Sequence, residues 1–167
     1  MSKIKYKVYK DVLPEEQWKH LHDFISNAWF SWTYAAGTSH SGEGYNTIGD
    51  TPQLVRNFFH REQVATTTAQ AHKLLPNHNP LRIKANLLQP YPDAPEHHPW
   101  HTDAANNNVS MIYYINDSDG DTFLGETDTQ KVTPKANTAV IFPSNLRHAS
   151  SNPTKGRRMI INYMVQA

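Results

Sequence analysis

The stretch His101-Thr-Asp-Ala-Ala-Asn-Asn-Asn-Val-Ser-Met-Ile-Tyr-Tyr-Ile-Asn116 joins a candidate metal-binding pair to a strand-like run, and it decides both the fold and the chemistry. Residues i and i+2 of an extended segment point to one side, so His101 and Asp103 are placed to bind one ion together. A second imidazole follows at His148. Two imidazoles and one carboxylate form the ligand set of open non-haem iron(II) sites, so these residues predict an iron centre. Taken alone, the pair at 101 and 103 also fits a loop histidine beside a solvated carboxylate.

The second half of the chain has the periodicity of short strands separated by Pro, Gly, Asn and Asp. Strands are predicted over residues 81–89, 109–116, 122–124, 130–132, 138–142, 147–150 and 157–165. Many short strands at such spacing are typical of a sandwich or barrel.

The first half of the chain is predicted to be mainly helical. Residues 3–9 alternate like a strand, and Pro14 opens a helix through about residue 27. Residues 31–50 form a long polar loop, and Thr51-Pro52 resembles a helix start that continues through about residue 61. A further helix is expected over about 62–75. We therefore predict one domain over 1–167 of mainly β class, with helical support over about 1–80 and a strand-rich core over about 81–167.

Composition and charge narrow the classes of function. The absence of cysteine excludes disulfides, thiolate zinc sites and cysteine nucleophiles. The formal net charge of +1 gives no electrostatic case for a nucleic-acid or membrane partner. The N-terminal residues alternate lysine with apolar side chains and contain no signal-peptide core, so a cytoplasmic protein is expected. The sequence leaves monomer and homodimer both open.

A candidate anchor for a carboxylate lies at the start of the last predicted strand. Arginine presents a planar fork that binds a carboxylate through two parallel hydrogen bonds, so Arg158 is suited to hold the far end of a dicarboxylic cosubstrate. Arg157 competes for this role, because adjacent strand residues face opposite ways and only one of the two can enter a pocket. Either could also be an exposed arginine at the end of a strand.

Residues 83–166 together resemble the iron(II)- and 2-oxoglutarate-dependent dioxygenases, and among them the prolyl-hydroxylase-like group. Four segments carry the resemblance in order. They are Gln89-Pro-Tyr-Pro92, His101-Thr-Asp103, Met111-Ile-Tyr-Tyr-Ile-Asn116, and Val132-Thr-Pro-Lys-Ala-Asn-Thr-Ala-Val-Ile-Phe142 followed by His148 and Arg158. The resemblance implies a double-stranded β-helix, the cupin-like jelly-roll, with Fe(II), 2-oxoglutarate and O2 as cofactor and cosubstrates.

The resemblance also implies a role for each site residue. His101, Asp103 and His148 would be the catalytic metal ligands, and Arg158 would pair with the C5 carboxylate of 2-oxoglutarate. Tyr114 would donate a hydroxyl hydrogen bond to the same carboxylate, while Tyr91 would line the pocket near the iron or the cosubstrate. Tyr113 competes with Tyr114 for its place, since neighbouring strand residues face opposite sides.

The implied reaction is hydroxylation of an unactivated C–H bond, with succinate and CO2 as coproducts. A retained Asp103 favours hydroxylation over halogenation, because the related halogenases leave that coordination position to halide. The substrate would be a prolyl or other residue of a peptide, a free amino acid or a small metabolite. The alternative is a non-catalytic metal-binding jelly-roll module or sensor, which would have no need of an arginine clamp.

Two positions depart from the family pattern, and two further histidines lie close to the first ligand. Asn137 replaces a turn glycine, and asparagine tolerates left-handed backbone better than most residues. The usual Gly-Gly after the 111–116 strand is reduced to Asp119-Gly-Asp121. His97 and His98 stand in a proline-rich approach to His101 and are expected to be exposed, within reach of a substrate.

Overall fold

The computed structural model describes residues 5–38, 49–58, 74–75, 80–106 and 108–167, which form mainly strands. The elements are β1 (Lys7–Tyr9), α1 (Glu15–Ser26), β2 (Thr33–Ala35), β3 (Gln53–Asn57), β4 (Pro80–Leu88), β5 (Val109–Tyr114), β6 (Thr122–Leu124), β7 (Gln130–Val132), β8 (Thr138–Pro143), β9 (His148–Ser150) and β10 (Arg158–Val165). The prediction of a mainly β fold is confirmed.

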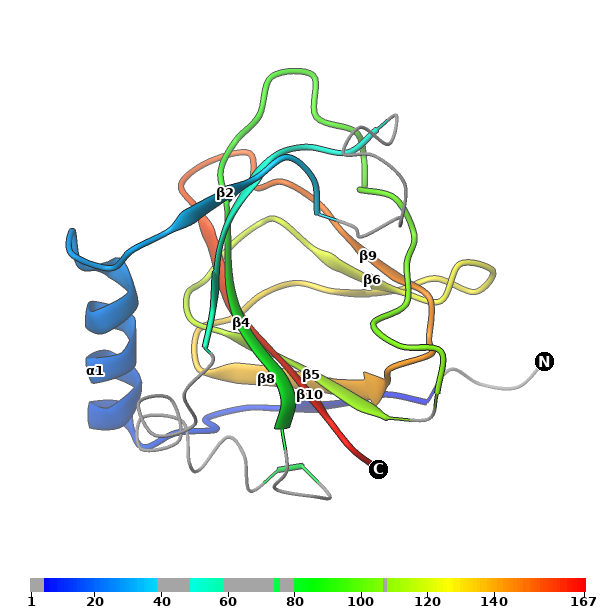
Figure 1. Ribbon diagram of the computed structural model, residues 1–167, viewed down its shortest axis with the longest axis horizontal. Helices are drawn as coiled ribbons and strands as arrows, with labels where there is room; N and C mark the ends of the chain where they lie inside the picture. Colours follow the sequence, from blue (N-terminus) through cyan, green and yellow to red (C-terminus); the bar gives the residue numbers. More distant parts are fainter. Residues whose placement is uncertain (1–4, 39–48, 59–73, 76–79, 107) are drawn as a thin grey trace.

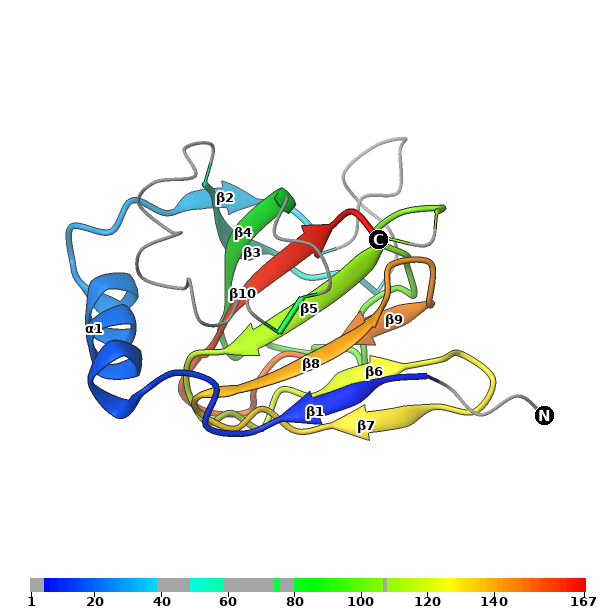
Figure 2. The ribbon, with the colours of Figure 1, turned by 90° about the horizontal axis from the view of Figure 1, so that it is seen from below.

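The strands form two antiparallel sheets. The major sheet has seven strands in the order β1-β8-β5-β10-β4-β3-β2, and the minor sheet has three in the order β7-β6-β9. Strands distant in sequence are therefore neighbours, as β4 and β5 both pair with β10. This is the jelly-roll that the resemblance implied, a form of the sandwich or barrel that the strand pattern predicted, and Figures 1 and 2 show its two sheets.

The helix α1 covers the outer face of the major sheet (Figure 1). Pro14 precedes its first turn, where Glu15 and Glu16 complement the positive end of the helix dipole. Its buried Leu21 and Ile25 pack into the core. The prediction of a helix starting at Pro14 and running to about residue 27 is confirmed.

Alternate residues of the central strands divide the buried apolar side chains into two clusters. The outer cluster lies between α1 and the major sheet and includes Ile83, Ala85 and Leu87 of β4. The inner cluster lies between the two sheets and joins Leu124 of β6 to Ile160 of β10 among others. Because side chains of a strand alternate, the residues of β4 between those of the outer cluster face the space between the sheets. That space holds the candidate site.

The predicted helix over about 51–61 is wrong, because the described part of this segment is the strand β3. Its residues pair with β4, placing Leu54 opposite Leu87 and Val55 opposite Asn86. The N-terminal signal of Thr51-Pro52 is local, whereas the open edge of β4 offers backbone partners and apolar contacts that override it. The strand β2 then pairs with β3 inside the segment expected to be a loop.

The helix expected over about 62–75 lies almost wholly outside the described residues. Among the described residues, the helical support expected over 1–80 is therefore α1 alone, while β1, β2 and β3 extend the major sheet. The seven strands predicted after residue 80 are all present, and their ends differ from the prediction by at most two residues. No helix among the described residues is long and apolar enough to cross a bilayer.

Candidate active site

His101 and His148 lie directly opposite one another across a single antiparallel bridge. Their backbones exchange two hydrogen bonds, from the His101 N–H to the His148 carbonyl at 3.0 Å and back at 2.9 Å. This pairing sets the two imidazoles side by side, with ring centroids 4.3 Å apart. His148 begins β9, whereas His101 belongs to no regular strand, so the His-x-Asp pair sits at an isolated bridge followed by a bend.

Each imidazole is turned so that one nitrogen is left for a ligand. His101 Nδ1 lies 3.2 Å from the carbonyl of Pro99, and His148 Nδ1 lies 3.0 Å from that of Leu146. A carbonyl only accepts, so both Nδ1 atoms carry the proton and both Nε2 atoms keep a free lone pair. A backbone carbonyl behind the ring is the arrangement usually found for metal-bound histidines.

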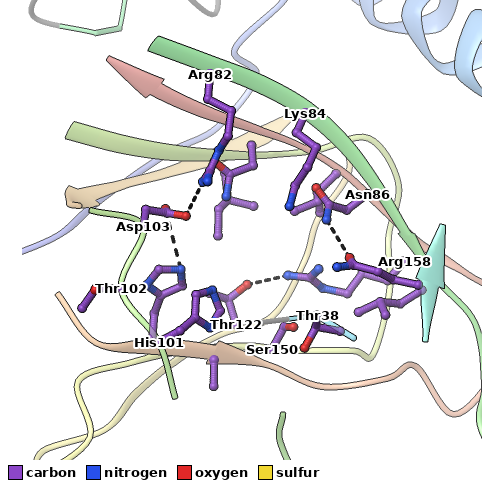
Figure 3. A pocket seen from close by; sticks show the side chains of 17 residues that line it. Thr38, Arg82, Lys84, Asn86, His101, Thr102, Asp103, Thr122, Ser150 and Arg158 are labelled. Atoms are coloured by element: carbon purple, nitrogen blue, oxygen red, sulfur yellow. Dashed lines mark hydrogen bonds and ion pairs between the residues drawn. The ribbon is translucent and has the colours of Figure 1, made fainter. Parts of the chain in front are cut away.

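Asp103 is held in place through its backbone and both carboxylate oxygens. Its N–H donates to the Ser144 carbonyl at 3.0 Å. Oδ2 accepts from the Ser110 hydroxyl at 2.6 Å and lies 3.7 Å from His148 Nε2, while Oδ1 accepts from Arg82. Figure 3 shows Asp103 and His101 on the same side of the pocket. The ligand atoms of Asp103 and the two histidines all lie within 4.8 Å of one another, so the three donors fit one metal ion.

The protonation states of the three residues suit metal binding. Burial is the main cause that lowers the pKa of His101 to about 4, and it also lowers the pKa of His148. Burial alone would raise the pKa of Asp103, but His148, the Arg82 cation and the Ser110 hydroxyl together hold it below its usual value. At neutral pH the imidazoles are thus neutral and the carboxylate ionised, the forms that bind a cation.

These three residues line one end of a cavity of about 240 Å³ that reaches across the sheets to Arg158. The wall is formed by Thr38, Gln53, Arg82, Lys84, Asn86, Leu88, His101, Thr102, Asp103, Ile112, Thr122, His148, Ala149, Ser150, Arg158, Ile160 and Asn162. Ligand pockets usually have volumes of roughly 300–1,000 Å³, so this one suits a small and polar guest.

Arg158 is buried, with 2% of its surface exposed, and no carboxylate of a described residue lies within ion-pair distance of it. Its Nε donates to the Gly120 carbonyl at 2.9 Å, and its Nη2 donates to the Thr122 hydroxyl at 2.8 Å. No described residue accepts from Nη1, so two N–H donors stay available at the cavity. Gly120 is required here, because a Cβ would lie 2.7 Å from the Ser151 carbonyl oxygen.

The structure places one member of each competing pair at the cavity side. Arg158 lines the cavity, whereas Arg157 is exposed. Tyr114 packs in the inner cluster beside Arg158, and Tyr113 packs in the outer cluster. Tyr114 itself is not among the lining residues, since its hydroxyl donates to Thr122 at 2.9 Å and Thr122 stands between it and the cavity.

The comparisons with known proteins agree with this geometry. The family model described as the 2OG-Fe(II) oxygenase superfamily matches residues 87–166, which contain all three candidate ligands and Arg158. The match covers nearly half of the chain and indicates an oxidoreductase of the dioxygenase type, and this family uses Fe(II), 2-oxoglutarate and O2.

Solved structures with the same fold share little sequence with this oxygenase. A prolyl-4-hydroxylase from Pseudomonas putida aligns over 97% of this chain and 92% of its own, with 14% identity and a TM-score of 0.66. A Trichoplax adhaerens prolyl hydroxylase, in complex with a hypoxia inducible factor peptide, aligns over 96% and 83%, with 14% identity and a TM-score of 0.67. The epimerase SnoN from nogalamycin biosynthesis aligns over 95% and 76%, with 10% identity and a TM-score of 0.64. No curated protein matches the sequence.

Two residues near the site lie elsewhere than the sequence suggested. Tyr91 does not reach this cavity, since it is 47% exposed and lines a separate depression with Tyr34 and Leu54. The expectation that His98 is exposed is wrong, because it is fully buried. Its Nε2 lies 2.8 Å from Asn152 Oδ1 and its Nδ1 lies 2.9 Å from the Ser150 hydroxyl. His98 thus ties the approach segment to β9 and the loop that follows.

Sequence reasoning missed several polar residues of the oxygenase cavity. Among them, Thr122 was assigned only to a strand, and Arg82, Lys84 and Asn86 were not singled out at all. A signal was present, because the last three alternate with the apolar Ile83, Ala85 and Leu87, and so share one strand face. Burial, reinforced by the Arg82 cation, lowers the pKa of Lys84 to about 8.

Proposed function

We propose that this oxygenase hydroxylates an unactivated C–H bond of a second substrate while 2-oxoglutarate is converted to succinate and CO2. The substrate is a peptide residue, a free amino acid or a small metabolite. One observation carries the proposal: a single small cavity joins a His-Asp-His donor set to a buried arginine with unmet donors. Residues 1–167 act as a single oxygenase domain in this proposal, because β1, β2 and β3 belong to the same sheet as β4, β5, β8 and β10.

The metal end of the cavity is formed by His101, Asp103 and His148. The two Nε2 atoms and a carboxylate oxygen would hold iron(II). Bound iron would supply the redox chemistry that activates dioxygen. Arg82 and Ser110 fix the orientation of Asp103 and share its negative charge, so the carboxylate cannot turn away from the two histidines.

The cosubstrate end is formed by Arg158 and the residues behind it. The two free N–H donors of Nη1 pair with the C5 carboxylate of 2-oxoglutarate, which also supplies the negative charge that the buried guanidinium lacks. The Thr122 oxygen already accepts two hydrogen bonds, from Arg158 and Tyr114, so its own proton is free to donate. Thr122 is therefore the hydroxyl donor to the carboxylate, while Tyr114 orients Thr122 from behind.

The test is anaerobic addition of iron(II) and 2-oxoglutarate while the visible charge-transfer absorption of the ternary complex is followed. The wild type should develop the band, and exposure to O2 should then release succinate. Asp103→Ala should give no band, whereas Arg157→Met, an exposed neighbour of the clamp, should behave as wild type. A wild type that binds iron(II) but gives neither band nor succinate would refute the proposal and favour the non-catalytic metal-binding module.

A further inference from the structure

The inner face of β4 carries two cations beside the metal-binding residues. Arg82 and Lys84 are two positions apart on one strand, so both side chains enter the cavity from the same wall. In Figure 3, Arg82 extends from β4 to Asp103, and Lys84 points from the same strand into the pocket. In the proposed function, Lys84 neither binds the metal nor contacts 2-oxoglutarate. Arg82 takes part only through its ion pair with Asp103.

Both residues have hydrogen-bonding capacity that the described part of the protein leaves unused. Arg82 contacts Asp103 and Asn162 through Nη2, but its Nε is buried and has no acceptor. Lys84 has no hydrogen bond or ion pair with any described residue, although most of its side chain is enclosed. Buried polar groups without partners are rare and costly, so an acceptor is expected to enter from the cavity.

A count of charges gives the sign of the missing partner. The described wall holds three cations, Arg82, Lys84 and Arg158, against the single carboxylate of Asp103. In the proposed complex, the two positive charges of iron(II) are matched by the two negative charges of 2-oxoglutarate. Two positive charges therefore stay in excess within a small and largely enclosed space, where unpaired charge is unfavourable.

Asn86, the next residue of β4 on the same face, carries a third polar group without a hydrogen-bond partner among the described residues. Gln53 Nε2 donates to the Gly37 carbonyl, so Gln53 Oε1 must be the atom that accepts from Asn86 Nδ2 at 2.6 Å. This fixes the amide of Asn86 and leaves its buried Oδ1 without a donor. The wall formed by β4 thus offers two cationic donors and, beside them, one acceptor.

We propose that the Lys84 ammonium and the Arg82 Nε–H bind an anionic oxygen group of the second substrate, a carboxylate or a phosphate. The inference rests on the proposed function and narrows its substrate class. Because Arg82 touches Asp103, the anionic group binds close to the metal ligands, and the carbon to be hydroxylated lies within a few bonds of it. An N–H or O–H donor of the same molecule would meet Asn86 Oδ1. A small acidic molecule fits this wall, whereas an uncharged peptide segment does not.

The probes are sulfate and acetate, titrated calorimetrically into the anaerobic protein loaded with iron(II) and 2-oxoglutarate. Wild type should bind one anion while the charge-transfer band of the cosubstrate persists. Lys84→Met should bind that anion at least about tenfold more weakly, as loss of a charge-assisted hydrogen bond requires, and should retain the band. Lys7→Met, which removes an exposed lysine on β1, is the matched control and should bind like wild type. Tighter binding of sulfate would point to a phosphorylated substrate, and tighter binding of acetate to a carboxylic acid.

Three results would overturn the inference: no anion bound, equal affinity in Lys84→Met, or loss of the band when the anion binds. Loss of the band when the anion binds would place the anion in the cosubstrate site. Loss of the band in Lys84→Met would place the lysine there. Failure of the proposed function is distinct, because it appears as absence of the band in wild type without any added anion. Each protein is checked for the same thermal unfolding profile, so a misfolded variant is recognised before titration.

Discussion

The hydroxyl of Thr122 connects the arginine clamp to Tyr114, and a double-mutant cycle on this contact tests the cosubstrate end of the cavity. Thr122 Oγ1 accepts from Arg158 Nη2 at 2.8 Å and from the Tyr114 hydroxyl at 2.9 Å. Both donors are buried, with 2% and 0% of their surfaces exposed. Thr122→Val keeps the shape but removes the acceptor, so both donors lose their partner in the metal-free protein.

The magnitude follows from the cost of leaving buried donors unpaired, about 1–3 kcal/mol each. Thr122→Val should thus lower the free energy of unfolding by roughly 2–6 kcal/mol, a large part of the roughly 5–15 kcal/mol of a typical domain. Tyr114→Phe in the wild type should cost only about 0.5–1.5 kcal/mol, the net value of one hydrogen bond. In the Thr122→Val background the same change should stabilise by about 1–3 kcal/mol, because it deletes a hydroxyl that has no partner.

Urea denaturation of the four metal-free proteins measures this reversal of sign, provided the m-values agree. Tyr113→Phe is the matched control, since the Tyr113 hydroxyl donates to Asn137 on the other face of the sheet. It should destabilise equally with and without Thr122→Val, because the two networks share no partner. If Tyr114→Phe destabilises both backgrounds by the same amount, the Thr122 contact does not organise this end of the site.

Further outcomes follow from the clamp, the metal ligands and the turn. Arg158→Met should weaken 2-oxoglutarate binding by one to two orders of magnitude in the absorption titration. Arg157→Met, which changes an exposed residue, should not weaken it. Unchanged affinity in Arg158→Met would contradict the assignment of Arg158 as the carboxylate clamp. Iron(II) should raise the melting temperature of wild type but not of Asp103→Ala, and an equal rise in both would exclude this carboxylate as a ligand. In the folded protein the pKa of His101 is lowered to about 4. As the pH falls below about 6.5, this residue therefore takes up a proton in the unfolded chain before it does so in the folded protein. Stability of the metal-free protein should therefore fall by up to about 3 kcal/mol from pH 6.5 to pH 4, and less in His101→Gln, as urea midpoints would show. Asn137→Gly should keep the turn yet lose about 1–3 kcal/mol in the same assay, and a neutral effect would mean that the side chain contributes nothing.

The strands after residue 80 were predictable because their signals are local. Proline, glycine, asparagine and aspartate punctuate that half of the chain, and an antiparallel sheet with short connections leaves each strand bounded by its own turns. The strands β2 and β3, at one side of the major sheet, were not predictable in the same way. β3 pairs with β4 and β2 pairs with β3, and Thr51-Pro52 carries a helix signal that the distant pairing with β4 overrides.

Asn137 shows how a departure from a family pattern gains a reason from tertiary contacts. The sequence predicted that asparagine would tolerate a left-handed backbone, and its φ of 57° confirms this. The structure adds what the side chain does there: Oδ1 accepts from the Leu13 N–H and the Tyr113 hydroxyl, and Nδ2 donates to the Leu13 carbonyl. The residue that replaces glycine therefore ties the segment before α1 to the major sheet. No local pattern encodes a contact between residues so far apart in the chain.

The candidate metal ligands and the wall of β4 proposed to bind an anion differ in how far the sequence reveals them. His101, Asp103 and His148 are recognisable because few chemistries require that combination of residue types. Arg82 and Lys84 are ordinary strand cations by type, and alternation shows only that they share a face. On a half-buried strand the polar face normally meets water, but here the minor sheet and the segment His101–Asp103 line the other side of the cavity. Whether that face meets water or a cavity depends on the sheet that packs over it. The residues proposed to select the substrate can therefore be recognised only from the structure of both sheets.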